Sequence, residues 1–271
     1  MQAPPIPEAL EKDTLRARRF RSSRTIFALV LREMATTYGR SPGGYIWAIL
    51  DPALALALLS IIFSLAFSAP SIGTSFPLFY ATGYLPFMMF NDVANKMATS
   101  INFSRPLLAY PAVTFIDALA ARFLLNVLTH LMVAYLVFTG IIVLMDVPVQ
   151  IHFGAILVSL YMAAILGIGV GTLNCYLMTA FPIWERSWQI ATRPLFIISG
   201  IFFIYDDIPP IGQDIIWYNP LIHVVGMMRQ GIYATYDASY VSLTYVSALS
   251  LGCLTMGLLL LWRHHRQLLE S

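Results

Sequence analysis

Six long apolar runs constrain the fold of this chain more than any other feature of its 271-residue sequence. The hydrocarbon core of a bilayer is about 30 Å thick and is crossed by about 20 helical residues. The chain is 58% hydrophobic and only 11% charged, whereas about a quarter of the residues of a soluble domain are charged. We therefore predict an all-α integral membrane protein with six transmembrane helices, at about residues 45–69, 78–99, 119–145, 153–181, 189–205 and 243–262.

The distribution of charge predicts which ends of these helices face the cytoplasm. Lys and Arg accumulate in cytoplasmic segments of membrane proteins. The basic residues cluster before the first run, near the junctions between the second and third and between the fourth and fifth runs, and after the sixth run. They are Lys12, Arg16, Arg18, Arg19, Arg21, Arg24, Arg32, Arg40, Arg105, Arg122, Arg186, Arg193, Arg263 and Arg266. Acidic residues dominate the loops at the opposite ends of the runs. Both terminal tails, residues 1–22 and 263–271, are therefore expected in the cytoplasm. The first 25 residues contain no apolar core of a cleavable signal peptide.

A short amphipathic segment precedes the first run. Within residues 23–39, Phe27, Val30, Leu31 and Met34 recur at helical spacing among charged residues. This pattern predicts an amphipathic interface helix that lies along the inner headgroups. A solvated helix packed on a partner protein is an alternative, and the two do not exclude each other.

Asp51 and Pro52 interrupt the start of the first span. Aspartate is a favoured N-cap and proline is favoured at the first helical position, so we expect a break or kink here, with the spanning helix beginning at Pro52. The alternative is one kinked helix from Gly44 that carries Asp51 inside it. In either case Tyr45 and Trp47 would lie at the inner interface.

A few polar residues lie within the predicted spans. Asp92 and Lys96 are four residues apart, which favours a mutual ion pair over a gate or an aqueous path. Asn126 and His130 have the same spacing. For these two we expect an interhelical hydrogen bond rather than a proton relay, because no carboxylate shares their face.

Glycines and cysteines in the spans have a packing interpretation. Gly167 and Gly171 of "LGIGVGTLN" would let a neighbouring helix approach closely. Cys175 and Cys253 lie inside predicted spans and are expected to be small packing residues.

Residues 206–235 are too apolar for a free loop and too rich in proline and glycine for a span. We predict re-entrant short helices that bury Ile215, Ile216, Trp217, Leu221 and Val225 while the acidic residues face water. Such backbone is tolerated at membrane depth only where protein or a water-filled cavity covers it.

The sequence contains no motif for energy conversion or catalysis. A phosphate-binding loop needs Gly-Lys followed by Ser or Thr, and the only lysines lie in "EKD" and "NKM". We expect no cofactor in this chain and no enzyme activity of its own.

Two motifs resemble a known family. "YGRSPGGYIWAILDP" is similar to the N-terminal motif of type 2 ABC exporter permeases, and "SGIFFIYDDIPP" followed by "WYNPLIHVVGMMRQGIY" resembles their final signature, with Asn219, Pro220 and Arg229. The resemblance covers residues 23–262 as one transmembrane domain. The nearest branch is the capsular polysaccharide export (KpsM-like) family.

The resemblance implies a permease subunit in the bacterial inner membrane. It pairs with a second copy of itself, and each copy recruits a separate ATPase subunit that binds ATP and Mg. The family's ATPase grips the interface helix and the loop between spans two and three, here residues 100–118. This implies an ATPase-coupling role for Arg32, Ser104, Arg105, Pro106, Tyr110 and Pro111. An ordinary amphipathic connector is the alternative for the loop.

Passage of a sugar polymer needs a wet path with surfaces on which sugars slide. Aromatic faces suit this purpose, although most aromatics in membrane proteins serve interface belts or packing. The candidates to line a channel are Tyr45, Trp47, Tyr80, Tyr84, Phe87, Phe90, Phe196 and Phe202, with Asp51, Asp92 and Lys96 as candidates for a gate.

The resemblance implies further partners: a polysaccharide, lipid-linked at one end, periplasmic co-polymerase-like and outer-membrane export proteins, and membrane lipids, but no nucleic acid. An O-antigen or teichoic acid permease remains an alternative. A drug or lipid exporter is disfavoured by the short loop "PSIGTSFP". A proton-coupled transporter would need a midplane carboxylate and repeated halves, and an intramembrane enzyme would need a partner for His130.

Overall fold

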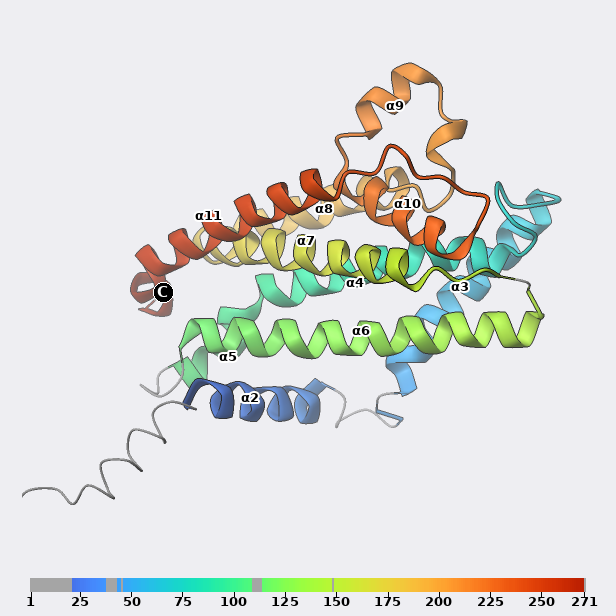
Figure 1. The fold of residues 1–271 in the computed structure, drawn as a ribbon. Helices are drawn as coiled ribbons and strands as arrows, with labels where there is room; N and C mark the ends of the chain where they lie inside the picture. Colours follow the sequence, from blue (N-terminus) through green and yellow to red (C-terminus); the bar gives the residue numbers. More distant parts are fainter. Residues whose placement is uncertain (1–20, 38–42, 45, 109–113, 148, 271) are drawn as a thin grey trace, which may run out of the picture.

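The chain folds into a bundle of helices, seen in a computed structural model that describes residues 21–37, 43–44, 46–108, 114–147 and 149–270 (Figure 1). Within these ranges there is no strand, in agreement with the predicted all-α class. The helices are α2 (Arg21–Thr37), α3 (Ile46–Ala66), α4 (Phe76–Ala98), α5 (Ser100–Leu108), α6 (Phe115–Met145), α7 (Phe153–Ala180), α8 (Pro182–Ile198), the 3-10 turn η1 (Tyr205–Asp207), α9 (Pro210–Ile216), α10 (Pro220–Ile232) and α11 (Leu243–Glu270).

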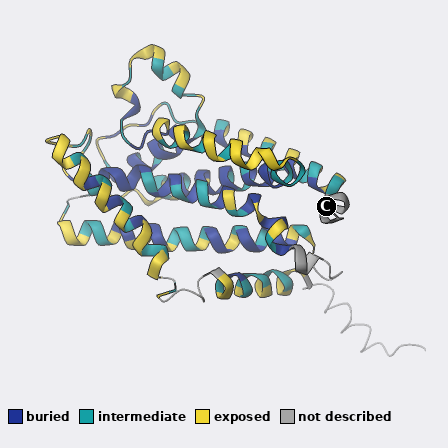
Figure 2. Ribbon diagram, turned by 180° about the vertical axis from the view of Figure 1, so that it is seen from behind, coloured by how far each residue is buried: buried dark blue, intermediate teal, exposed yellow. Residues whose placement is uncertain are grey.

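Helices α4 and α7 form the centre of the bundle. α7 packs on α4, α10 and α11, while α4 also packs on α3, α6 and α10, and Figure 2 shows buried residues concentrated in the middle of the bundle. A Cβ at Gly167 would lie 2.8 Å from the Val93 side chain, and one at Gly171 would lie 2.6 Å from Met97. The predicted role of these two glycines in close helix packing is confirmed.

The ends of the long helices follow from local capping. Thr114 and Asp117 form a reciprocal capping box at the start of α6. Ser75 accepts a hydrogen bond from the Leu78 N–H at the start of α4, and Asp146 adopts a left-handed conformation (φ 47°) at the end of α6. These caps fix where the chain turns between α3, α4, α6 and α7.

α3 runs without a break through Asp51 and Pro52, so the prediction of a helix that begins at Pro52 is wrong. The chain turns earlier, at Gly43 and Gly44, which both have positive φ, and Ile46 N–H donates to the Gly43 carbonyl at 2.9 Å. A proline inside a helix removes one hydrogen bond, whereas non-helical backbone before it would leave several polar groups unpaired in an apolar surrounding.

Four helices of the described chain are long and apolar enough to cross a membrane: Ile46–Ala66, Phe115–Met145, Phe153–Ala180 and Leu243–His264. α4, at the predicted span 78–99, does not reach this apolar content, since it carries Asn91, Asp92, Asn95 and Lys96, and it lies inside the bundle.

The predicted span 189–205 needs correction. The helix at this place, α8, begins at Pro182 and ends at Ile198, after 17 residues. Pro182 occupies its first turn, and Gly200, with φ 84°, follows its end. Residues 199–204 form turns instead of the last part of a span.

Two short helices, α9 and α10, lie between α8 and α11. α10 packs against both α4 and α7 and buries Leu221 and Val225 as predicted. α9 projects from the bundle (Figure 1) and leaves Ile215 71% exposed, contrary to the expectation that this residue is buried.

Candidate functional site

Two amides on α4 face α8. Asn95 Nδ2 donates to Asn91 Oδ1 at 3.3 Å, one helical turn away, and Trp188 Nε1 of α8 donates to Asn95 Oδ1 at 3.3 Å. This chain of hydrogen bonds fixes the orientation of both amides and links α8 to α4.

A groove of about 360 Å³ lies between these two helices. Every residue of α8 is at least partly exposed, so one face of α8 forms an open wall of the groove. Among the residues that line it, only Arg193 carries a formal charge. The lining residues are Phe87, Asn91, Asn95, Trp188, Gln189, Thr192, Arg193 and Phe196. Aromatic faces, amides and one guanidinium are a set that binds hydroxylated ligands through stacking and hydrogen bonds.

Most of the predicted channel aromatics meet beside this groove. The Phe196 ring lies 5.1 Å from Phe87, 6.2 Å from Tyr84 and 5.4 Å from Phe202. Phe202 in turn lies 6.1 Å from Tyr80, and Phe87 lies 6.4 Å from Phe90. One cluster therefore contains six of the eight aromatics proposed from the sequence.

Burial divides this aromatic cluster. Tyr80, Phe87 and Phe90 are 3%, 6% and 2% exposed, which identifies them as packing residues in the single chain. Tyr84, Phe196 and Phe202 are half-buried, and of these three Phe196 lines the groove.

The other two aromatic candidates lie elsewhere. Trp47 is 51% exposed and lines a second pocket, of about 340 Å³, between α3, α4 and α6. Tyr45 lies outside the described residues. The structure therefore does not bring Trp47 to the aromatic cluster.

The second pocket gathers the predicted gate residues. Asp51, Asp92 and Lys96 all line it, together with His130. Asp92 Oδ2 lies 3.2 Å from His130 Nε2, so in the described chain the polar contact of Asp92 is with His130 and not with Lys96 as predicted. The expectation that His130 lacks a carboxylate partner is also wrong, because α4 places Asp92 against α6.

Asn126 bonds within its own helix. Its Nδ2 donates to the Arg122 carbonyl at 2.8 Å, whereas the sequence predicted an interhelical hydrogen bond. Asn126 nevertheless lines the same pocket as His130.

A buried ion pair joins α2 to the bundle. Arg122 Nε lies 3.0 Å from Glu33 Oε1, and its Nη1 donates to the Lys96 carbonyl at 2.8 Å and to Thr99 Oγ1 at 3.1 Å. The guanidinium also lies 4.2 Å from the centre of the Phe103 ring of α5. Arg122 thus connects α2, α4, α5 and α6 at the end of the bundle that carries α2.

The predicted ATPase-coupling residues lie at this junction as far as they are described. α5 forms within residues 100–118, the loop that the resemblance assigned to ATPase coupling, and Ser104 is buried in it. The guanidinium of Arg32 lies 5.6 Å from the Phe103 ring. Arg105 and Pro106 belong to α5, but their side chains, and all of Tyr110 and Pro111, lie outside the described part of the chain.

The signature residues within 206–235 connect α8 to α10. Asn219 caps α10 by accepting from the Leu221 N–H at 3.1 Å, and its Nδ2 donates to the Ile198 carbonyl at 3.1 Å, while Pro220 occupies the first helical position. Arg229 is 1% exposed and donates to the carbonyls of Phe203 at 2.6 Å and Ile201 at 3.2 Å. Its guanidinium lies 4.5 Å from the centre of the Phe79 ring.

Sequence reasoning missed the polar side of the groove and the partner of Arg122. The groove had a visible signal, because Phe87, Asn91 and Asn95 recur at helical spacing and so do Gln189, Thr192 and Arg193. Glu33 gave no such signal, since 89 residues separate it from Arg122.

Comparison with known proteins shows the relatives of the chain. The family model described as "ABC-2 type transporter" matches residues 24–233. The polysialic acid transport protein KpsM of Escherichia coli is 32% identical over 91% of this chain and 96% of its own length. The capsule polysaccharide export inner-membrane proteins BexB of Haemophilus influenzae (27%, 88% of this chain, 89% of the relative) and CtrC of Neisseria meningitidis (26%, 87% and 89%) are also similar.

Proposed function

The chain belongs to the ABC-2 type transporter family, and from this premise we propose that it is the permease subunit of an ATP-driven exporter that moves capsular polysaccharide across the bacterial inner membrane. Members such as KpsM and BexB are permease subunits and not enzymes, and ATP is hydrolysed on a separate chain. The relatives' names connect them with capsule polysaccharide and polysialic acid.

The observation that carries the proposal is the groove between α4 and α8. Its aromatic, amide and guanidinium side chains suit a hydroxylated polymer, and the exposed face of α8 leaves one side of it open. Polar side chains at membrane depth face a bundle interior or water. A second copy of the chain, related by a two-fold axis, would close the open side and form a conduit with two such walls.

In this proposal, separate ATPase subunits supply the energy for transport and this chain supplies the path. Separate ATPase subunits bind at the α2–α5 junction, where Arg122 joins four helices, and their movement changes the position of α4 and hence of the groove wall. Both termini lie in the cytoplasm, and a lipid-linked polymer passes outward to periplasmic and outer-membrane export proteins.

Deletion of the gene tests this proposal. Cells without the chain are expected to make the polymer and retain it in the cytoplasm, and the wild-type gene on a plasmid restores it to the surface. Immunogold labelling of thin sections measures its location. Normal surface capsule in the deletion strain would overturn the proposal.

A further inference from the structure

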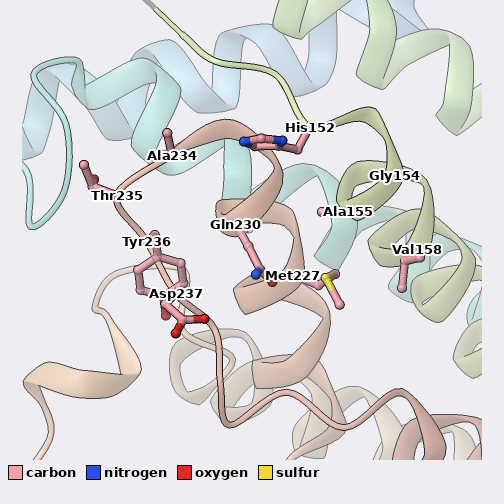
Figure 3. Close-up of a pocket in the computed structure, with 10 residues that line it drawn as sticks. All are labelled: His152, Gly154, Ala155, Val158, Met227, Gln230, Ala234, Thr235, Tyr236 and Asp237. Atoms are coloured by element: carbon pink, nitrogen blue, oxygen red, sulfur yellow. The ribbon is translucent and has the colours of Figure 1, made fainter.

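A pocket of about 620 Å³ lies at the other end of the bundle from α2, between the start of α7, the end of α10 and the segment that follows α10 (Figure 3). Its size falls within the range of small-ligand sites, about 300–1,000 Å³. None of the groove residues between α4 and α8 lines it. Its lining residues are His152, Gly154, Ala155, Val158, Met227, Gln230, Ala234, Thr235, Tyr236 and Asp237.

Several polar side chains of this pocket are available to a ligand. Gln230, Thr235 and Asp237 make no side-chain hydrogen bond or ion pair with another residue of the described chain, and Figure 3 shows Gln230 and Asp237 directed toward the same space. A carboxylate, an amide and a hydroxyl in the lining offer a ligand both acceptors and donors.

The opposite wall of the pocket is apolar and open. Ala155 and Val158 of α7 line it beside Met227 of α10. At Gly154, an added Cβ would meet no atom within 4 Å. A smooth apolar wall facing a polar one suits a sugar ring, which has a C–H face and a rim of hydroxyls.

The frame of the pocket is held by short contacts. The His152 N–H donates to the Gly231 carbonyl at 2.8 Å, which joins α7 to the end of α10. A Cβ at Gly231 would lie 2.5 Å from Ile156, so the two helices touch here. Tyr236 and Tyr240 share a hydrogen bond of 3.1 Å, and burial raises the pKa of Tyr236, so that its hydroxyl stays neutral. A preformed pocket binds a ligand at a lower entropic cost.

The charge of the pocket selects among ligands. Asp237 supplies the one carboxylate, and none of the ten lining residues is Lys or Arg. Arg229 precedes Gln230 in sequence, but its guanidinium lies against Phe79 and the Phe203 carbonyl. A phosphate or a uronate would meet Asp237 with no guanidinium or ammonium group in the lining to compensate it, whereas a neutral sugar would meet hydrogen-bonding groups.

We propose that this pocket binds one neutral sugar residue of the exported polymer after it has left the conduit. The identity of the polymer rests on the proposed function, but the affinity of the pocket for neutral sugars does not. Weak binding here holds the emerged chain outside and opposes its return.

A cavity-filling variant tests the pocket directly. Full-length protein in nanodiscs is titrated with neutral disaccharides, with uronate-containing ones, and with oligosaccharides cut from the surface polysaccharide of the organism that carries the gene, and binding is followed by saturation-transfer NMR. Gly154→Leu is expected to weaken binding of neutral sugars at least about tenfold, because the leucine occupies the space of the ring. Asp237→Asn is expected to weaken it as well and to reduce the preference for neutral over acidic sugars.

Gly252→Leu provides the matched control. Gly252 lies in α11, and an added Cβ there also meets no atom within 4 Å, so this variant should bind sugars like the wild type. The proposal would be overturned by any of four results. These are sugar binding by Gly154→Leu equal to that of the wild type, no sugar binding by the wild type, stronger binding of uronates than of neutral sugars, and displacement of the sugar by phosphoethanolamine. Normal capsule in the deletion strain would contradict the proposed function alone and leave the sugar titration valid.

Discussion

Glu33 Oε1 lies 3.0 Å from Arg122 Nε, and the two side chains are 5% and 6% exposed. Removal of one member of a buried ion pair leaves an uncompensated charge and costs about 3–5 kcal/mol. Glu33→Gln is therefore expected to lower the melting temperature by several degrees in a thermal-shift assay, while Glu185→Gln, on the exposed part of α8, leaves it unchanged.

The double variant measures the interaction energy between Glu33 and Arg122 apart from the contacts that each makes with other residues. Glu33→Gln with Arg122→Gln should be less destabilised than the sum of the single variants, because neither charge is then left alone. Additive losses would show that the two side chains act independently.

Asp92 and His130 are expected to be energetically coupled, whereas Asp92 and Lys96 are not. Asp92 is 36% exposed and His130 12% exposed, and the pair should be worth about 1 kcal/mol or less at this exposure. A double-mutant cycle with Asp92→Asn and His130→Gln, measured by denaturant unfolding, is expected to give this coupling. A larger coupling in the Asp92→Asn and Lys96→Gln cycle would show that the helical i, i+4 pair predominates.

Arg229 holds the turn that follows α8. Arg229→Met removes the donors to the Phe203 and Ile201 carbonyls, and each buried carbonyl left unpaired costs about 1–3 kcal/mol. Faster hydrogen exchange is expected in residues 199–204, together with loss of export. Arg229→Lys should behave similarly, since one ammonium does not reproduce two nitrogens of a planar guanidinium.

The exposed Arg186 of α8 supplies the control for this variant. Arg186→Met should leave exchange in residues 199–204 unchanged. Unaltered exchange in Arg229→Met would contradict the role of Arg229 in holding the turn.

Filling the groove should slow export without unfolding the protein. Thr192→Trp places an indole between α4 and α8, and the export rate should fall at least about tenfold, which corresponds to a barrier raised by about 1.4 kcal/mol. Ile190→Trp adds the same ring at a 68% exposed position of α8 that does not line the groove, and it should export normally. Surface polysaccharide per cell and the amount of protein in the membrane provide the measurement. Equal export by both variants would exclude the groove as the path.

The sequence predicted local features better than contacts between distant segments. The amphipathic spacing of Phe27, Leu31 and their neighbours corresponds to α2, and the short helices predicted within residues 206–235 correspond to α9 and α10. The predicted break at Asp51 is wrong. The preference of Asp and Pro for the start of a helix competes there with the need to hydrogen-bond backbone groups in an apolar surrounding, and the second effect is larger.

Partner choice within the bundle could not be predicted from spacing along one helix. Lys96 lies one turn from Asp92 in sequence, yet α6 brings His130 to the carboxylate. The aromatic cluster was easier to predict from the sequence, because Tyr80, Tyr84 and Phe87 share one face of α4 and Phe196 comes from the adjacent α8. Its division into buried and half-buried rings depends on how α3, α4 and α8 cross, which the sequence does not specify.

Reconstitution tests most directly whether this chain is a passive permease that a separate ATPase subunit drives. Purified protein in proteoliposomes, alone or with its separate ATPase subunit, is supplied with ATP and labelled polysaccharide, and accumulation of polymer and release of phosphate are both measured. We predict ATP hydrolysis coupled to transport only when both chains are present. Hydrolysis of ATP, or accumulation of polymer against a gradient, by the isolated chain would contradict the account.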